Sequence, residues 1–345
     1  MFPSMPQEDD WDAEATRDVA RASRGGRGAG TYGAVPDEGH TSHRSGNSSG
    51  GEERKEEPEE DEEELEEIEV VPVRRQLSLA IAVFAGLLGM GLILGSATAA
   101  PDNRLPFTIV LFGVQLLFLL AWTMALRPPA AGATAGVCVA VALVADYLAS
   151  ERDGTGFLTL LLVAVGGFVV ALVGQLFRSE DRARVSDSYR TTLVIVLGVV
   201  AYAIPVILTR VPVGTQTVEV CAAAAGVALL VARVTDAIFP KPRIAPQVPR
   251  GATGVVVGAM LGTLVAAVLG SVLVLPFTPA KGAVIGLIAA VVASLVDLAV
   301  NFGEAGRTLA GDAPTFWVAR HMQGPLGAFA LVAPVAYALT QWYMS

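Results

Sequence analysis

Residues 77–97 read LSLAIAVFAGLLGMGLILGSA, a run without a single charged side chain. A helix needs about 20 predominantly apolar residues to cross a hydrocarbon core about 30 Å thick. Backbone N–H and C=O groups find no water in lipid, so a run of this kind must satisfy them internally as a helix. Residues 77–97 therefore predict a transmembrane helix.

Runs of similar length and composition recur to the end of the chain, in which 53% of all residues are hydrophobic. The predicted fold is all-α, a polytopic transmembrane helical bundle that occupies residues 76–345. The high content of Ala, Val, Gly and Arg is typical of a high-GC bacterium. We place about nine spans near residues 77–97, 106–126, 130–149, 157–177, 191–209, 217–238, 253–275, 281–301 and 326–343.

The first 75 residues have a different composition, rich in Gly, Ser, Arg and Glu. They hold 21 acidic and 9 basic side chains, whereas the rest of the chain holds 12 acidic and 15 basic ones. Such a segment cannot bury enough apolar surface to offset its chain entropy. Residues 1–75 are therefore predicted to be a disordered acidic tail, suited to basic cytosolic proteins as partners. No motif in the chain indicates a nucleic-acid partner.

The distribution of Lys and Arg between the predicted spans sets the orientation, because cytoplasmic loops carry an excess of both. With the tail inside, twelve basic residues lie on the inner side and four on the outer side. The chain is therefore predicted to lie in the cell membrane with a cytoplasmic N-terminus and an outside C-terminus. The inner residues are Arg74, Arg75, Arg127, Arg178, Arg182, Arg184, Arg190, Lys241, Arg243, Arg250, Arg307 and Arg320. The outer ones are Arg104, Arg152, Arg210 and Lys281.

Four acidic residues lie in predicted spans, where a charge is costly and often marks function. Asp146 and Glu219 are near predicted outer ends and are interpreted mainly as water-exposed helix ends. Asp236 and Asp297 are near inner ends and are weighed evenly as a polar site or as solvated helix ends. His321 lies in a predicted inner loop, and without a carboxylate or second His nearby it is a poor metal ligand.

Small residues recur at every fourth position of the predicted span 253–275. This spacing keeps them near one face, which lets another helix approach closely. Packing within the bundle is favoured over a dimer interface through Gly254, Gly258 and Gly262, because such patterns are common in polytopic bundles. The full set is Gly254, Gly258, Gly262, Ala266 and Gly270.

Polar elements follow one another in a distinctive order within residues 190–345. Val234-Thr235-Asp236 ends one span, a loop containing Ala245-Pro246 precedes the Gly-rich span, and Val296-Asp297-Leu298 ends the next. His321 then precedes Ala333-Pro334-Val335 in the last span. This order resembles the phosphatidate cytidylyltransferases (CDP-diacylglycerol synthases), membrane enzymes that make CDP-diacylglycerol from phosphatidic acid and CTP.

Several side chains of that family are missing from this sequence. Val300 and Asn301 stand where the family has Glu and Ser, and the loop before Gly254 lacks the family's Lys-Thr pair. Nucleotidyl transfer needs divalent ions that are held by two or more carboxylates. Only Asp297 has a plain counterpart among the family's metal ligands. The resemblance therefore implies a pseudoenzyme without a cofactor.

Three functions remain open on the sequence alone. The preferred one is a non-catalytic membrane protein that binds an anionic lipid head group or another protein, since basic residues at inner helix ends suit phosphate. The alternative is a divergent but active CTP-dependent phospholipid nucleotidyltransferase that holds Mg²⁺ through Asp236, Asp297 and Asp312. A small-solute transporter ranks last, because no inverted repeat is visible. The candidate polar site is Asp236, Asp297, Asp312 and His321, and the candidate head-group contacts are Arg243, Arg250, Arg307 and Arg320.

Overall fold

The computed structural model describes residues 71–100, 103–128, 131–151, 154–176, 185–273, 275–312 and 316–343. The predicted tail lies outside the described residues apart from 71–75, and so do Arg152, Arg178, Arg182 and Arg184. The described helices are α2 (Arg75–Ala97), α3 (Leu105–Leu126), α4 (Ala131–Glu151), α5 (Phe157–Leu176), α6 (Val185–Ala201), α7 (Ile204–Leu208), α8 (Gly214–Ile238), α9 (Ala252–Val272), α10 (Pro279–Leu309) and α11 (Trp317–Trp342).

Nine helical segments of the described chain are long and apolar enough to cross a membrane. Eight are single helices, and the fifth in chain order, Tyr189–Leu208, combines most of α6 with α7. No strand occurs within the described ranges. The prediction of an all-α, multi-pass membrane bundle is therefore confirmed.

The predicted span 191–209 is interrupted by a turn between α6 and α7. Pro205 lies at the start of α7, and a proline lacks the N–H that a continuous helix would use there. The Ala203 N–H donates to the Val200 carbonyl at 3.0 Å, although an unbroken helix would direct it to Val199. The break therefore leaves the Val199 carbonyl open to a side chain from another helix.

α10 and α11 both extend further than the apolar runs predict. α10 continues past residue 301 to Leu309, and α11 begins at Trp317 instead of near residue 326. The prediction of a loop at His321 is therefore wrong. Its polar neighbours and Pro325 favoured a loop, but α11 contains all of these residues. At 1.5 Å per residue, the 31 residues of α10 span about 46 Å, well beyond a hydrocarbon core of about 30 Å.

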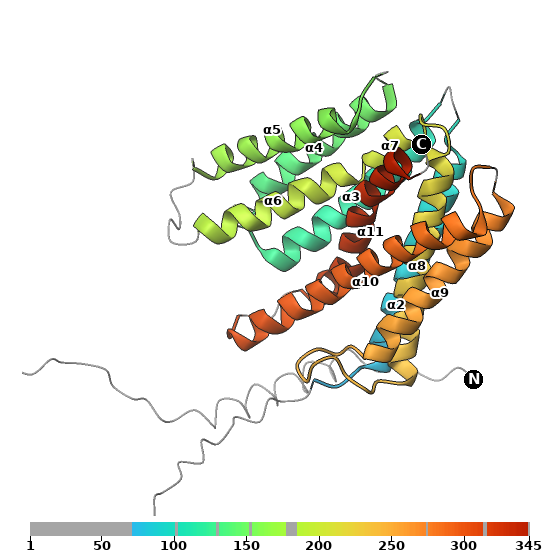
Figure 1. Ribbon diagram of the computed structural model, residues 1–345. Coiled ribbons are helices and arrows are strands. Elements are labelled where there is room, and N and C mark those ends of the chain that lie inside the picture. The colour runs from blue at the N-terminus through green and yellow to red at the C-terminus, as the bar shows by residue number, and fades with distance from the viewer. Residues whose placement is uncertain are drawn as a thin grey trace, which may run out of the picture. The chain divides into compact units, whose positions relative to one another are not determined.

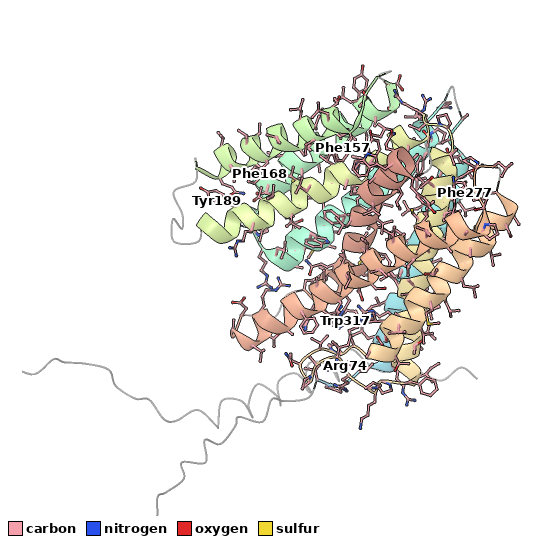
Figure 2. The ribbon with its side chains drawn as sticks, viewed as in Figure 1. Arg74, Phe157, Phe168, Tyr189, Phe277 and Trp317 are labelled. Atoms are coloured by element: carbon pink, nitrogen blue, oxygen red, sulfur yellow. The ribbon has the colours of Figure 1, made fainter. Side chains whose placement is uncertain are left out.

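α8 lies at the centre of one half of the bundle, where it packs against α2, α9 and α10 (Figure 1). α11 joins this half to the other, because it packs against α10, α8 and α3. In the second half, α4 and α6 contact each other and both α3 and α5. We call α2, α8, α9 and α10 the α8–α10 half, and α3, α4, α5 and α6 the α3–α6 half. Figure 2 marks Phe157 of α5, whose ring stacks on Tyr337 of α11 with 5.3 Å between ring centroids.

α9 is docked through the small residues predicted to lie on one face. Its buried residues are the same five, Gly254, Gly258, Gly262, Ala266 and Gly270. A Cβ on Gly258 would overlap the backbone of α8, and one on Gly270 would overlap the backbone just before α10. The favoured interpretation, packing within the bundle, is confirmed. A dimer through this face would have to displace α8 or α10.

Candidate functional site

Four ionic side chains form a closed group inside the α8–α10 half, and we call Arg233, Asp236, Arg250 and Asp297 the ionic cluster. Arg250 lies between α8 and α9, is completely buried, and reaches two carboxylates at once. Its Nη1 is 2.9 Å from Oδ2 of Asp236, and its Nη2 is 3.3 Å from Oδ2 of Asp297. Arg233 of α8 donates from Nη2 to Oδ1 of Asp297 at 2.7 Å. The cluster thus ties α8, α10 and the segment before α9 together.

Glycines fit closely around the ionic cluster. The Gly251 N–H donates to Oδ1 of Asp236 at 3.0 Å. A Cβ on Gly254 of α9 would overlap the Asp236 carboxylate, and a Cβ on Gly324 of α11 would overlap that of Asp297. Both neighbouring helices therefore approach the carboxylates at positions where a side chain would not fit.

Arg233 and Arg250 neutralise Asp236 and Asp297, whose charges would otherwise be very unfavourable in the interior of the bundle. A buried carboxylate is strongly destabilising unless an opposite charge and hydrogen bonds accompany it. Burial lowers the pKa of Arg250, as does the nearby Arg233, while the carboxylates of Asp297 and Asp236 oppose this shift. An arginine stays protonated in proteins even so, so the ionic cluster holds two positive and two negative charges.

The structure brings together three residues that the sequence singled out, Asp236, Asp297 and Arg250. The predicted role of Arg250 as a head-group contact does not fit its place, because its guanidinium is shielded and faces two carboxylates. Arg233 was not predicted. Its signal was nevertheless present, since an arginine inside an apolar span is as informative as an acid there.

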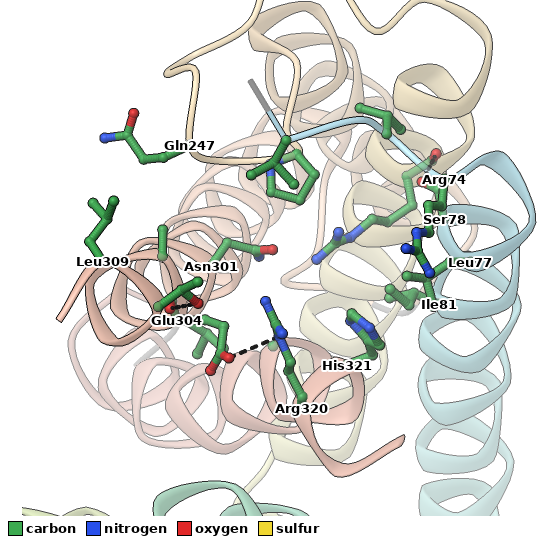
Figure 3. A pocket seen from close by; sticks show the side chains of 18 residues that line it. Arg74, Leu77, Ser78, Ile81, Gln247, Asn301, Glu304, Leu309, Arg320 and His321 are labelled. Atoms are coloured by element: carbon green, nitrogen blue, oxygen red, sulfur yellow. Dashed lines mark hydrogen bonds and ion pairs between the residues drawn. The ribbon is translucent and has the colours of Figure 1, made fainter. Parts of the chain in front are cut away.

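A cavity of about 730 Å³ opens beside the ionic cluster, at the end of the bundle where α2 begins and α10 ends. Part of its lining is apolar and includes Leu77 and Ile81 of α2 and Val300 of α10. Arg233 also lines the cavity, so its guanidinium belongs both to the ionic cluster and to the space beside it. Figure 3 shows how side chains of α2, α10 and α11 surround this space.

Further basic side chains line the same cavity. Arg74 lies just before α2 and forms no ion pair with another described residue. Nε of Arg320 lies 3.0 Å from Oε1 of Glu304, and the same Glu304 also pairs with Arg307. Figure 3 shows the Arg320–Glu304 pair across the space from Arg74, with His321 beside Arg320 on α11. Basic side chains therefore line the cavity on two sides, Arg74 near the apolar residues of α2 and Arg320 on α11.

Three predicted site residues belong neither to the ionic cluster nor to the cavity lining. Arg243 donates to the Val71 carbonyl, which fastens the segment before α2 to the segment between α8 and α9. Arg307 donates to the Ala125 carbonyl at the end of α3 at 2.9 Å. Asp312 is exposed after the end of α10. Arg243 and Arg307 thus support the walls of the cavity from outside.

The acids that the alternative function would use for Mg²⁺ do not share one site. Arg250 bridges Asp236 and Asp297, whereas Asp312 is exposed and makes no contact with this pair. In the part of the chain that the structure describes, no group of three His, Cys, Asp or Glu side chains is placed to hold a metal ion. Two carboxylates bind Mg²⁺ weakly without substrate phosphates, and here guanidinium groups already hold both.

Asp146 does not lie where the sequence suggested. Only 4% of it is exposed, and its Oδ1 accepts a hydrogen bond from Nε2 of Gln115 at 2.9 Å. The interpretation of Asp146 as a water-exposed helix end is wrong, because Gln115 of α3 covers it and also bonds Val199 of α6. Glu219 on α8 is half-buried.

The fold, the ionic cluster and the cavity can be set beside known proteins. No family model, no curated protein and no solved structure matches this chain.

Proposed function

We propose that this chain is a multi-pass protein of the cell membrane that binds the phosphate of an anionic lipid in the cavity beside α2. The cavity is the observation that carries the proposal. Its guanidinium groups suit phosphate, because arginine donates paired, charge-assisted hydrogen bonds to phosphate oxygens. Its apolar lining residues, among them Leu77 and Ile81, suit the glycerol and first methylene groups of the same lipid.

The position of the cavity supports a lipid ligand. It lies at one end of the spanning helices, where phospholipid head groups meet the protein, and basic pockets there attract anionic lipids. The excess of Lys and Arg on this side favours the cytoplasmic leaflet. In this orientation the N-terminus is cytoplasmic, and the nine spans found among the described residues bring the C-terminus to the outside.

The ionic cluster supports binding without nucleotidyl transfer. A divalent ion at Asp297 would compete with Arg233 and Arg250, and one at Asp236 would compete with Arg250. Two guanidinium groups thus stand where a transferase would need metal-binding carboxylates to be available. This arrangement favours a non-catalytic protein over the divergent transferase.

Lipid binding to the purified full-length protein tests the first part of the proposal. Native mass spectrometry would compare phosphatidic acid and phosphatidylglycerol with phosphatidylcholine. Arg74→Gln combined with Arg320→Gln should weaken binding of the anionic lipids roughly tenfold or more, because a hydrogen bond to a charged group contributes about 1.5–3 kcal/mol. Arg75→Gln combined with Lys241→Gln is the matched control, since both side chains are exposed and neither lines the cavity.

Equal loss of anionic-lipid binding in both double variants would show only a general charge effect and would overturn the site.

Incubation of the wild-type protein with CTP, phosphatidic acid and Mg²⁺ tests the second part of the proposal, the absence of nucleotidyl transfer. We expect no CDP-diacylglycerol, and its formation would instead support the divergent transferase.

A further inference from the structure

A second buried polar group lies in the other half of the bundle. Asp146 of α4 is 4% exposed and Gln115 of α3 is 1% exposed. Nε2 of Gln115 donates to Oδ1 of Asp146 at 2.9 Å and to the Val199 carbonyl at 3.2 Å. Because both partners are acceptors, the amide nitrogen must face them, which fixes the orientation of the Gln115 side chain.

The break between α6 and α7 makes this arrangement available. Val199 lies in the last turn of α6, and its carbonyl has lost the helical partner that Ala203 would supply. Backbone acceptors at membrane depth need a partner from the protein, since lipid provides none. Gln115 supplies that partner and thereby holds Asp146 beside the break.

The Asp146 carboxylate has no compensating charge within the described residues. Its Oδ2 and the Oε1 of Gln115 are buried without a hydrogen-bond partner. The helices packed against α4 offer little charge, because α3, α5 and α7 contain no Asp, Glu, Lys, Arg or His. α6 carries Asp187 and Arg190 only in its first two turns, at the opposite end from Val199.

The other polar groups around α4 are also engaged or directed elsewhere. Arg210, after α7, donates from Nη2 to the Ala149 carbonyl at 2.6 Å, and Glu151 ends α4 as an exposed residue. Tyr202 donates its hydroxyl to the Leu326 carbonyl of α11 at 2.6 Å. Tyr147, next to Asp146, is 64% exposed. No described group therefore forms an ion pair with Asp146.

We propose that Asp146 is a proton-binding site and that its carboxyl is a neutral acid in the folded protein. An ionised carboxylate without a counter-charge is strongly disfavoured at membrane depth. A proton on Oδ2 removes the charge, while Oδ1 remains an acceptor for Gln115. A metal cation fits less well, because the Gln115 N–H group directs its positive end into the same space.

Proton binding at Asp146 links stability to pH. The folded state keeps a proton that the unfolded chain releases at neutral pH, so the folded state binds more protons than the unfolded state. Stability should therefore fall as pH rises above about 4, where an unfolded aspartate ionises, for as long as the folded state keeps the extra proton. Asp146→Asn, which is neutral at every pH, should weaken this dependence.

Infrared spectroscopy of the purified full-length protein in lipid nanodiscs tests the proposal directly. The C=O stretch of a protonated carboxyl lies apart from the carboxylate bands, so one buried acid can be detected. At neutral pH, the wild-type protein should show a carboxyl band that is lost in Asp146→Asn. Glu219→Gln is the control, because Glu219 is a half-buried acid on another helix, and it should retain the Asp146 band.

Gln115→Leu keeps the test informative even where Asp146→Asn does not fold. It removes the N–H donor to Oδ1, so the carboxyl band should persist and move to higher frequency. If no carboxyl band at neutral pH is lost in Asp146→Asn or shifted in Gln115→Leu, the proposal is overturned. Stabilisation of the wild type by Na⁺ over choline, lost in Asp146→Asn, would also overturn it and identify a metal cation instead.

Discussion

The α8–α10 half neutralises its buried acids with two arginines, whereas the α3–α6 half places only a glutamine beside Asp146. Asp236 and Asp297 each face a guanidinium within 3.3 Å. Asp146 faces an uncharged amide nitrogen at 2.9 Å. Asp236, Asp297 and Asp146 are all completely or almost completely buried. Only the α8–α10 half keeps its aspartates ionised.

This difference shows how the partner determines what a buried acid can do. Ionised partners lock one another in place, because removing either leaves the other charge unpaired. An amide partner tolerates both the acid and its neutral replacements, so it fixes geometry without fixing charge. The ionic cluster is therefore suited to holding helices together, and the Asp146 pair is suited to exchanging a proton.

Removing the central arginine should give the largest effect. Arg250→Gln leaves Asp236 and Asp297 without the group that bridges them and should destabilise the protein by about 3–5 kcal/mol. The thermal unfolding midpoint and the yield of monodisperse protein would measure this loss. Lys241→Gln, in the same segment but exposed, should be nearly neutral. A normal midpoint for Arg250→Gln would mean that the ionic cluster contributes no stability.

Adding one methyl group beside the cluster should have a smaller effect than removing one of its charges. Gly324→Ala would push a Cβ into the Asp297 carboxylate, and overpacking of this kind typically costs about 1–3 kcal/mol. Gly303→Ala in α10 is the matched control, because its Cβ would meet no atom within 4 Å. The control should be neutral or slightly stabilising in the same thermal assay, and a similar loss in both variants would contradict the close fit.

Neutralising the isolated acid should cost less than neutralising a clustered one. Asp146→Asn replaces one uncharged group by another beside Gln115 and should change stability by about 1 kcal/mol or less. Asp297→Asn removes the charge between Arg233 and Arg250 and should cost about 3–5 kcal/mol. Parallel thermal unfolding of the two variants at neutral pH would compare their losses of stability. Equal losses would contradict the proposed difference between the two halves.

The smallest predicted effect concerns the rim of the cavity. Glu304 pairs with Arg320 and Arg307, so Glu304→Gln should release Arg320 for the lipid phosphate and tighten binding about two- to fivefold, the range expected for a partly exposed ion pair. Lipid titration by native mass spectrometry would measure the change. Asp312→Asn removes an exposed acid outside the cavity and serves as the control. Weaker binding in Glu304→Gln would show that Glu304 shapes the site instead of competing with the ligand.

For the part of the chain that the structure describes, the sequence predicted the number and type of spanning helices, because span length and hydrophobicity are properties of contiguous residues. It also predicted the packing role of Gly258 and its neighbours, since their spacing places them on one face. The prediction failed for His321 and for the start of α11, where polar residues occur within a helix. Apolar runs mark where a helix crosses lipid and do not mark where it ends.

The contacts of the candidate site could be predicted only in part. Asp236 and Asp297 were recognisable because acids are rare in apolar spans. Their pairing with Arg250 was not, since Arg250 follows α8 and Asp297 lies in α10, and only the packing of α8, α9 and α10 brings them together. Asp146 was misplaced for a similar reason, because burial by α3 depends on a neighbour that sequence position does not reveal.

The closed charge balance of the ionic cluster also constrains how this sequence can change over evolutionary time. A single substitution of Arg233, Asp236, Arg250 or Asp297 by an uncharged residue leaves a residual charge, so loss of charge at these four positions requires two replacements together. Paired substitution of Arg250 and Asp236 by uncharged residues of similar volume is one such route, because Arg233 can still neutralise Asp297. Related sequences should therefore keep or lose these charges in pairs. The residues that line the cavity should instead be substituted one at a time, independently of one another.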